Sequence, residues 1–257
     1  MKQLVLSIFC ITYSFVILYG QPITKESYSW SCHTNAGYAF PISRMKTGFI
    51  TDHLIEYEDD GAYWQFVTLN FFLARPFGVT ISVQGDFFTT QQKRQQSLYS
   101  AILNIYGNEY FLTEEPVYFE KIANVSLFAG LIYQADFKRI YFAPKVQIGI
   151  KSFSNTSESV FLKKNGANSY LNIQFYDNDR HVQQDHIALL TGTMIGYWLT
   201  EKISIELNLQ SVLFKPRFKY FQEARDPFTE STQIETFSYN RFVHNFSLGL
   251  GIGYFFD

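Results

Sequence analysis

The feature that most constrains this chain is an alternation of large apolar residues with small or polar ones. It is clearest near the C-terminus, where one face would carry Phe246, Leu248, Leu250, Ile252, Tyr254 and Phe256. Successive side chains of a strand point to opposite faces, so a period of two predicts a strand with one apolar face and one small or polar face. In a soluble sandwich the apolar face would look inward, whereas in a membrane barrel it would contact lipid.

The same alternation recurs along the chain and predicts eight strands in all. The other seven runs lie near residues 34–40, 67–73, 79–86, 124–134, 140–151, 187–199 and 203–210. The first of these has the weakest pattern. No stretch after Gly20 has the continuous apolar character of a membrane-spanning helix. The chain is therefore expected to be all-β.

The connections between these runs differ in length in a regular way. Three are short, at 74–77, 137–139 and 200–202, and four are long, near 42–60, 91–120, 155–185 and 216–240. Short and long connections alternate strictly, as they do in barrels with short periplasmic turns and long outer loops. This order predicts a closed antiparallel up-and-down transmembrane β-barrel rather than a sandwich.

The number of strands depends on one loop. Asn165-Gly166 lies between two alternating runs, which is a strong hairpin signal. This hairpin would either add two spanning strands, for ten in total, or project above the membrane. Lys163 and Lys164 beside the turn favour the projection and hence eight strands. Ser97 to Tyr106 raises the same question more weakly.

The N-terminus indicates export. Lys2 precedes a mostly apolar run from Leu4 to Leu18, and Gly20 then offers a small residue for cleavage. A spanning helix needs roughly 20 apolar residues, more than this run provides. We therefore expect a signal peptide at 1–20 and a barrel domain at 21–257. Only Cys32 would remain of the two cysteines, so the exported chain would contain no internal disulfide.

Composition supports the same interpretation. Aromatic residues make up 19 % of the chain, a surplus that suits strands ending in aromatic girdles at a lipid–water boundary. Trp64, Trp198 and Tyr254 are interpreted as such interface anchors. A formal net charge of −2 gives no reason to expect nucleic acid as a partner.

The pattern resembles the small outer-membrane β-barrels of the OmpA-, OmpX- and OmpW-like group, of the kind common in Bacteroidetes. The segments that carry this resemblance are 195–207, 249–256 and 35–38. The resemblance implies a fold and the cell outer membrane, and it implies no activity. Asp257 departs from it, since such barrels usually end on an aromatic residue. The implied partners are outer-membrane lipids, lipopolysaccharide and the barrel-assembly machinery, and the implied state is a monomer.

The polar residues expected to face the lumen form the candidate site. They are Gln84, Asp86, Gln134, Asp136, Lys145, Gln147, Lys151, Glu206 and Gln210. Eight strands leave an interior just wide enough for side chains, so we expect these residues to fill it as a polar network. Lys145 and Lys151 are the expected partners of Glu206 and Asp86. The main alternative is a narrow channel for small solutes.

The sequence does not predict catalysis or metal binding for this chain. Asp177, Asp179, His181, Asp185 and His186 offer possible metal ligands, but they lie in an expected outer loop without fixed geometry. A lipid-modifying enzyme would need a nucleophile and a base on one face, whereas His244 and Ser247 have opposite parity. The sequence therefore predicts a structural or surface-interaction role, with no catalytic residues, metal or cofactor.

Charged residues also gather in two of the expected outer loops. The first loop holds Asp52, Glu56, Glu58, Asp59 and Asp60, and the last loop with its flank holds Lys215, Arg217, Lys219 and Arg225. Basic residues just above the lipid can bind lipopolysaccharide phosphates. A solvated hairpin rim is the simpler interpretation.

Overall fold

The structure is a computed structural model that describes most of the chain after residue 28. The described ranges are 29–42, 61–89, 99–100, 102–113, 121–153, 158–166, 170–177, 184–215, 218–226, 231–239 and 242–256. The expected signal peptide at 1–20 lies outside them, and so do the acidic residues expected in the first outer loop. Among the described helical residues, none form a helix long and apolar enough to cross a bilayer.

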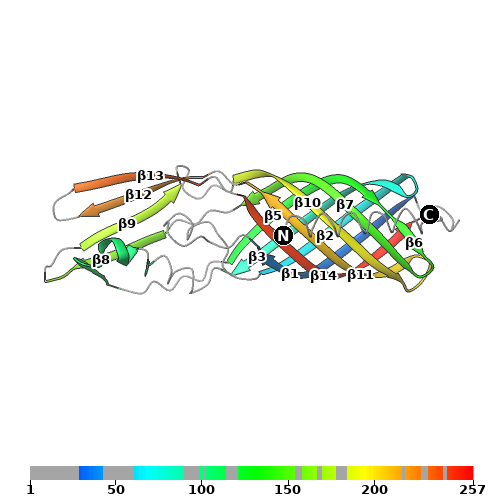
Figure 1. Cartoon of the computed structure of the whole chain (residues 1–257), viewed down its shortest axis with the longest axis horizontal. Coiled ribbons are helices and arrows are strands. Elements are labelled where there is room, and N and C mark those ends of the chain that lie inside the picture. Colours follow the sequence, from blue (N-terminus) through cyan, green and yellow to red (C-terminus); the bar gives the residue numbers. More distant parts are fainter. Residues whose placement is uncertain are drawn as a thin grey trace, which may run out of the picture.

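Eight long strands pair in a ring (Figure 1). They are β1 (Trp30–Pro41), β2 (Gly61–Ala74), β3 (Phe77–Thr89), β5 (Lys121–Tyr133), β7 (Ile140–Phe153), β10 (Gln184–Trp198), β11 (Ile203–Phe214) and β14 (Val243–Phe256). Each pairs antiparallel with its neighbours in chain order, and β14 pairs with β1 to close the ring. The expected closed eight-stranded barrel is confirmed.

The two faces of these strands differ as the alternation predicts. Leu73, Ile187 and Leu250 point outward and are 86 %, 75 % and 72 % exposed, while the alternate residues are mostly buried. An outer surface of this kind is stable only against lipid. The first strand begins at Trp30, before the expected start near Thr34, and so brings Ser31 and His33 into the barrel.

The short connections and the strand termini Trp30 and Phe256 lie at one end of the barrel. One turn contains Lys138 in the left-handed region, with φ 54°. A short strand, β6 (Ala135–Phe137), precedes it and pairs with the start of β7. By the order of short and long connections, this is the periplasmic end.

The long connections build a second sheet beyond the other end (Figure 1). Its order is β13-β12-β9-β8-β4, with β4 (Tyr110–Leu112), β8 (Glu158–Lys164), β9 (Tyr170–Asp177), β12 (Phe218–Asp226) and β13 (Ser231–Tyr239). We call it the outer sheet. The β8–β9 hairpin turns at Gly166, whose φ of 71° suits glycine. This hairpin belongs to the outer sheet and does not add strands to the barrel wall, which confirms a barrel of eight strands.

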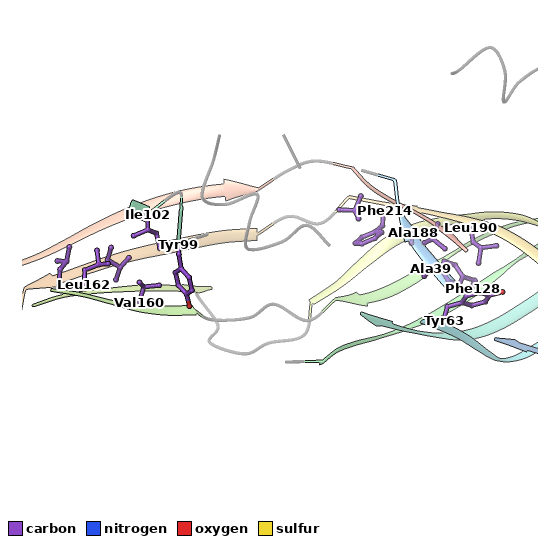
Figure 2. Packing of buried hydrophobic residues seen from close by; sticks show 14 residues of the cluster. Ala39, Tyr63, Tyr99, Ile102, Phe128, Val160, Leu162, Ala188, Leu190 and Phe214 are labelled. Atoms are coloured by element: carbon purple, nitrogen blue, oxygen red, sulfur yellow. The ribbon is translucent and has the colours of Figure 1, made fainter. Parts of the chain in front are cut away.

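One segment of the second long connection differs from expectation. Residues 99–100 and 102–106 are helical, so the suggestion of a further spanning strand at Ser97 to Tyr106 is wrong. Tyr99, Ile102 and Tyr106 recur at helical spacing, and Tyr99 and Ile102 are buried with Val160 and Leu162 of β8 (Figure 2). An alternation of two residues indicates a strand, whereas apolar residues three to four positions apart indicate a helix. In this segment the helical spacing matches the structure, and the helix packs on the outer sheet.

Closure of the barrel depends on small residues at the β1–β14 seam. Gly37 lies opposite Gly249, and a Cβ added to Gly37 would lie 2.0 Å from the carbonyl oxygen of Leu248. We expect Gly37→Leu to destabilise the barrel by about 1–3 kcal/mol through overpacking. The measurement is urea unfolding in lipid vesicles, followed by the heat-dependent shift of the folded band on a denaturing gel.

Tyr38→Leu is the matched control for this prediction. Tyr38 adjoins Gly37 but points outward and is 68 % exposed, so its replacement by another apolar residue should leave the folded band unchanged. Equal stability of the two variants would contradict the assigned register of the seam.

Candidate functional site: the barrel lumen

The lumen is lined by polar side chains from the barrel strands. Eight of the nine residues that the sequence assigned to it are buried: Gln84, Asp86, Gln134, Lys145, Gln147, Lys151, Glu206 and Gln210. The ninth, Asp136, is partly buried at the periplasmic end, where it pairs with Arg75 at 3.4 Å. Asp136 lies in the short strand β6, where Gln134 donates to it at 3.0 Å. The other buried polar residues form groups along the barrel.

The group nearest the outer end centres on an ion pair. Lys151 of β7 donates to the carboxylate of Asp86 of β3, and both side chains are almost fully buried. Gln84 also donates to Asp86 at 2.7 Å, and Gln210 donates to Gln84 at 2.6 Å. The Lys151 ammonium lies 5.3 Å from the ring centre of Phe214. The expected partnership of Lys151 with Asp86 is present.

The middle group is built from amides. The side-chain oxygen of Gln65 accepts from Asn35 at 2.7 Å, from Asn208 at 3.4 Å and from Lys145 at 3.4 Å. Asn208 also donates to Asn35 at 2.9 Å. Four strands are thereby linked across the lumen by one shared acceptor and its donors. The ammonium of Lys145 is thus held by an amide oxygen.

A parallel link joins β3 to β7 beside this group. Ser82 donates to the side-chain oxygen of Gln147 at 3.1 Å, and Gln147 donates in turn to Thr80 at 3.3 Å. Both partners of Gln147 are fully buried inward residues of β3. The amide therefore links β3 to β7 past the intervening strand β5.

The group nearest the periplasm surrounds Glu206. Its Oε1 is 2.6 Å from Nδ1 of His33 and accepts from Ser204 at 2.9 Å and from the hydroxyl of Tyr141. Lys145 was the expected partner of Glu206. It lies close enough to attract this carboxylate, but the contact within ion-pair distance is made by His33. The reason is the early start of β1, which the weak alternation of that strand did not reveal.

Ser31, His33 and Glu206 are ordered like a serine–histidine–acid triad. The Oγ of Ser31 is 2.7 Å from Nε2 of His33, whose other ring nitrogen contacts Glu206. All three side chains are buried, and the ring of Phe255 meets the imidazole edge-on at 5.3 Å. A nucleophile needs room for an acyl group, and Ser31 at 0 % exposure has none. This order therefore satisfies a buried carboxylate rather than supporting acyl transfer.

A buried aromatic cluster lies at the periplasmic end of the barrel. Trp198 and Phe255 have ring centres 4.3 Å apart, and Tyr141 lies 5.3 Å from Trp198 and 5.7 Å from Phe255. The other members of this buried cluster are Phe72, Ile132, Ala143 and Met194. The interpretation of Trp198 as an interface anchor is wrong, since it points inward. Trp64 and Tyr254 do face outward, at 49 % and 41 % exposure.

Several lumen residues were not anticipated from the sequence. His33 and Asn35 share the inward parity of β1, and Asn208 shares that of β11 between Glu206 and Gln210. Parity alone could have added these three. Gln65 could not be found in this way, because the register shifts between Gln65 and Val67 and the inward face changes parity there.

The other candidate sites remain predictions. Two of the five possible metal ligands, Asp179 and His181, lie outside the described residues. Within the described ranges, no cluster of three or more His, Cys, Asp or Glu is placed to hold a metal ion. Of the basic residues near the last loop, Lys215 is described, and its ammonium lies 5.2 Å from the ring centre of Phe242. Arg217 is not among the described residues.

Comparisons with known proteins give a likeness in fold only. No protein-family model matches the chain, and no curated protein matches it. A major outer membrane protein from Thermus thermophilus is 13 % identical, with 88 % of this chain and 98 % of that chain covered and a TM-score of 0.43. Neisserial surface protein A is 9 % identical, with 89 % and 97 % covered and a TM-score of 0.45.

A third solved structure belongs to an enzyme. The outer membrane protease OmpT from Escherichia coli is 7 % identical, with 92 % of this chain and 99 % of that chain covered and a TM-score of 0.37. The fold itself is decided by the chain's own geometry: eight strands in a closed ring with an apolar outer surface. The protein is an outer-membrane β-barrel of the small, eight-stranded type.

The Lys151–Asp86 pair should be a strong contributor to stability. We expect Lys151→Met to lower the free energy of unfolding by about 3–5 kcal/mol, because it leaves the Asp86 carboxylate buried without its cation. The double variant Asp86→Asn with Lys151→Met should recover most of this loss. Urea unfolding in vesicles measures all three chains, and a single variant as stable as the wild type would contradict the pairing.

Proposed function

We propose that this protein is a structural barrel whose lumen is filled, and whose outer sheet presents a surface to the cell exterior. The observation that carries the first part is a pair of hydrogen-bond networks between buried side chains. One runs from Lys151 near the outer end to Lys145 in the middle of the barrel. The other surrounds Glu206 near the periplasm. An interior of eight strands that is spanned by such bonds has little room for a solute.

Two features support a filled lumen over a narrow channel. The carboxylates Asp86 and Glu206 each have a cationic or imidazole partner, so the lumen does not present a row of charges of one sign. The buried aromatic cluster around Trp198 and Phe255 lies at the periplasmic end of the barrel.

Planar-bilayer recording tests this proposal. Refolded wild-type protein should show no steady, discrete conductance steps, because its hydrogen-bonded side chains span the lumen. A large porin recorded under the same conditions is the control for insertion and detection. Reproducible steps from the wild-type barrel, at a size that scales with salt concentration, would replace the filled barrel by the narrow channel.

The outer sheet supports the second part of the proposal. It draws its strands from three separate loops, with β4, the β8–β9 hairpin and the β12–β13 hairpin joined by backbone pairing. Val160, Leu162, Leu171 and Ile173 give it a buried side of its own. Backbone pairing between strands of different loops holds these loops in one arrangement. A surface-interaction role requires a surface that is held in this way.

The outer sheet should be separable from the barrel. Replacing residues 158–177 by a short Gly-Ser linker removes β8 and β9, which pair only within the outer sheet, so the barrel should keep its folded band. The β12–β13 hairpin loses its neighbour β9 and should become open to limited proteolysis. A barrel that no longer folds would show instead that the outer sheet is part of one cooperative unit.

The remaining roles are proposed on physical grounds. The outward apolar side chains contact membrane lipid. Binding of lipopolysaccharide by basic residues near Lys215, insertion by the barrel-assembly machinery, a monomeric state and cleavage of residues 1–20 are further parts of the proposal. The lumen is proposed to carry no catalysis, metal or cofactor.

A further inference from the structure

A polar pair lies on the lipid-facing side of the wall, outside the lumen. The Oγ of Ser211 on β11 is 2.5 Å from Nε2 of His244 on β14, and both side chains are half-buried. Ser211 lies between the buried residues Gln210 and Val212, and His244 lies between the buried Val243 and Asn245. The alternation therefore places both members of the pair on the outer face of two adjacent strands.

The sequence suggested a different partner for His244. Ser247 is only three residues away, but it is buried in the lumen and so lies on the other side of the wall. Ser211 is 33 residues distant in the chain and meets His244 because Leu213 pairs with His244 across the β11–β14 ladder. A nucleophile and its base must lie on the same face of the wall. His244 and Ser247 do not meet this requirement, whereas His244 and Ser211 do.

This pair has the chemistry of acyl transfer. An imidazole nitrogen in hydrogen-bond contact with a serine hydroxyl can take its proton as the oxygen attacks an ester carbonyl. Polar side chains on a membrane-facing surface are costly and usually mark function. Unlike Ser31 in the lumen, Ser211 keeps part of its surface open on the side where lipids lie.

The neighbours of the pair suit a lipid in the outer leaflet. Lys215 follows Ser211 by four positions on the same row of β11, just beyond the strand end, and its ammonium lies over the ring of Phe242. Four residues of a tilted strand rise by roughly 10 Å across the membrane. The ammonium of Lys215 is therefore expected at the level of the headgroups, with the hydroxyl of Ser211 on the side of the acyl chains.

We propose that Ser211 and His244 hydrolyse an acyl ester of an anionic lipid in the outer leaflet, with Lys215 binding the phosphate of its headgroup. The Oγ of Ser211 forms a bond to the acyl carbonyl carbon, and His244 moves the hydroxyl proton to the departing alcohol oxygen. Water then attacks the acyl-serine, with His244 accepting its proton. The fatty acid leaves and the proton returns to Ser211. Water is the only co-reactant, and the reaction is separate from the filled lumen.

The test uses the full chain refolded from inclusion bodies, which excludes lipases of the expression host. It is inserted into vesicles of phosphatidylethanolamine and phosphatidylglycerol, with or without added lipopolysaccharide, and released fatty acids are measured by mass spectrometry. Ser211→Ala and His244→Asn should lower the release rate about 100-fold or more. Ser247→Ala removes a hydroxyl on the lumen side and should release fatty acid at the wild-type rate.

The two vesicle types distinguish the sources of the ester. Release from both kinds of vesicle, or from the phospholipid vesicles alone, assigns a phospholipid, and release that requires lipopolysaccharide assigns the glycolipid. No release from either by folded wild-type protein would overturn the proposal, as would an unchanged rate in Ser211→Ala.

A second readout does not depend on whether the variants fold. A fluorophosphonate probe should attach to Ser211 of the wild-type chain, where peptide mapping can locate it. Lack of an adduct at Ser211, or an adduct at another serine alone, would overturn the assignment of Ser211 as the nucleophile.

Discussion

Closure of the backbone hydrogen-bond network is the constraint on which the rest of this structure depends. Inside a bilayer, every N–H and C=O must find a partner within the protein. The chain meets this demand by pairing β14 with β1 along the full length of β1, from Trp30 opposite Phe256 to Pro41 opposite Asn245. Gly37 and Gly249 allow these two strands to approach where a side chain would collide with the backbone.

The polar interior follows from this closure. Eight strands enclose a narrow space that side chains must fill, and the outward positions are already occupied by apolar residues that contact lipid. The polar residues therefore face one another and must satisfy their charges locally. Asp86 does so with Lys151, and Glu206 does so with His33, Ser204 and Tyr141. The same requirement explains why a triad-like order of hydrogen bonds is present at Ser31 without access for a substrate.

Much of the barrel could be predicted because outward apolar and inward polar side chains alternate along each strand. Alternation predicted inward positions for eight residues that are buried in the structure, and the order of short and long connections predicted an up-and-down barrel. The failures have local causes. A bulge at Gln65 reversed the parity of β2, and a weak pattern hid the start of β1 and hence His33. Trp198 was misassigned because aromatic residues occur both at lipid interfaces and in buried clusters inside a barrel. The partner of His244 lay 33 residues away, and only the register of β11 and β14 brings Ser211 beside it.

The outer sheet has a consequence for the order in which the molecule can be made. Its strands come from the connections β3–β5, β7–β10 and β11–β14, so no single loop contains enough neighbours to complete it. Each loop has to cross to the far side of the membrane as a chain without its final partners. The β12–β13 hairpin is the last of these segments in the sequence and pairs with β9. The outermost part of the protein is thus assembled only after translocation, by segments that meet for the first time outside the cell envelope.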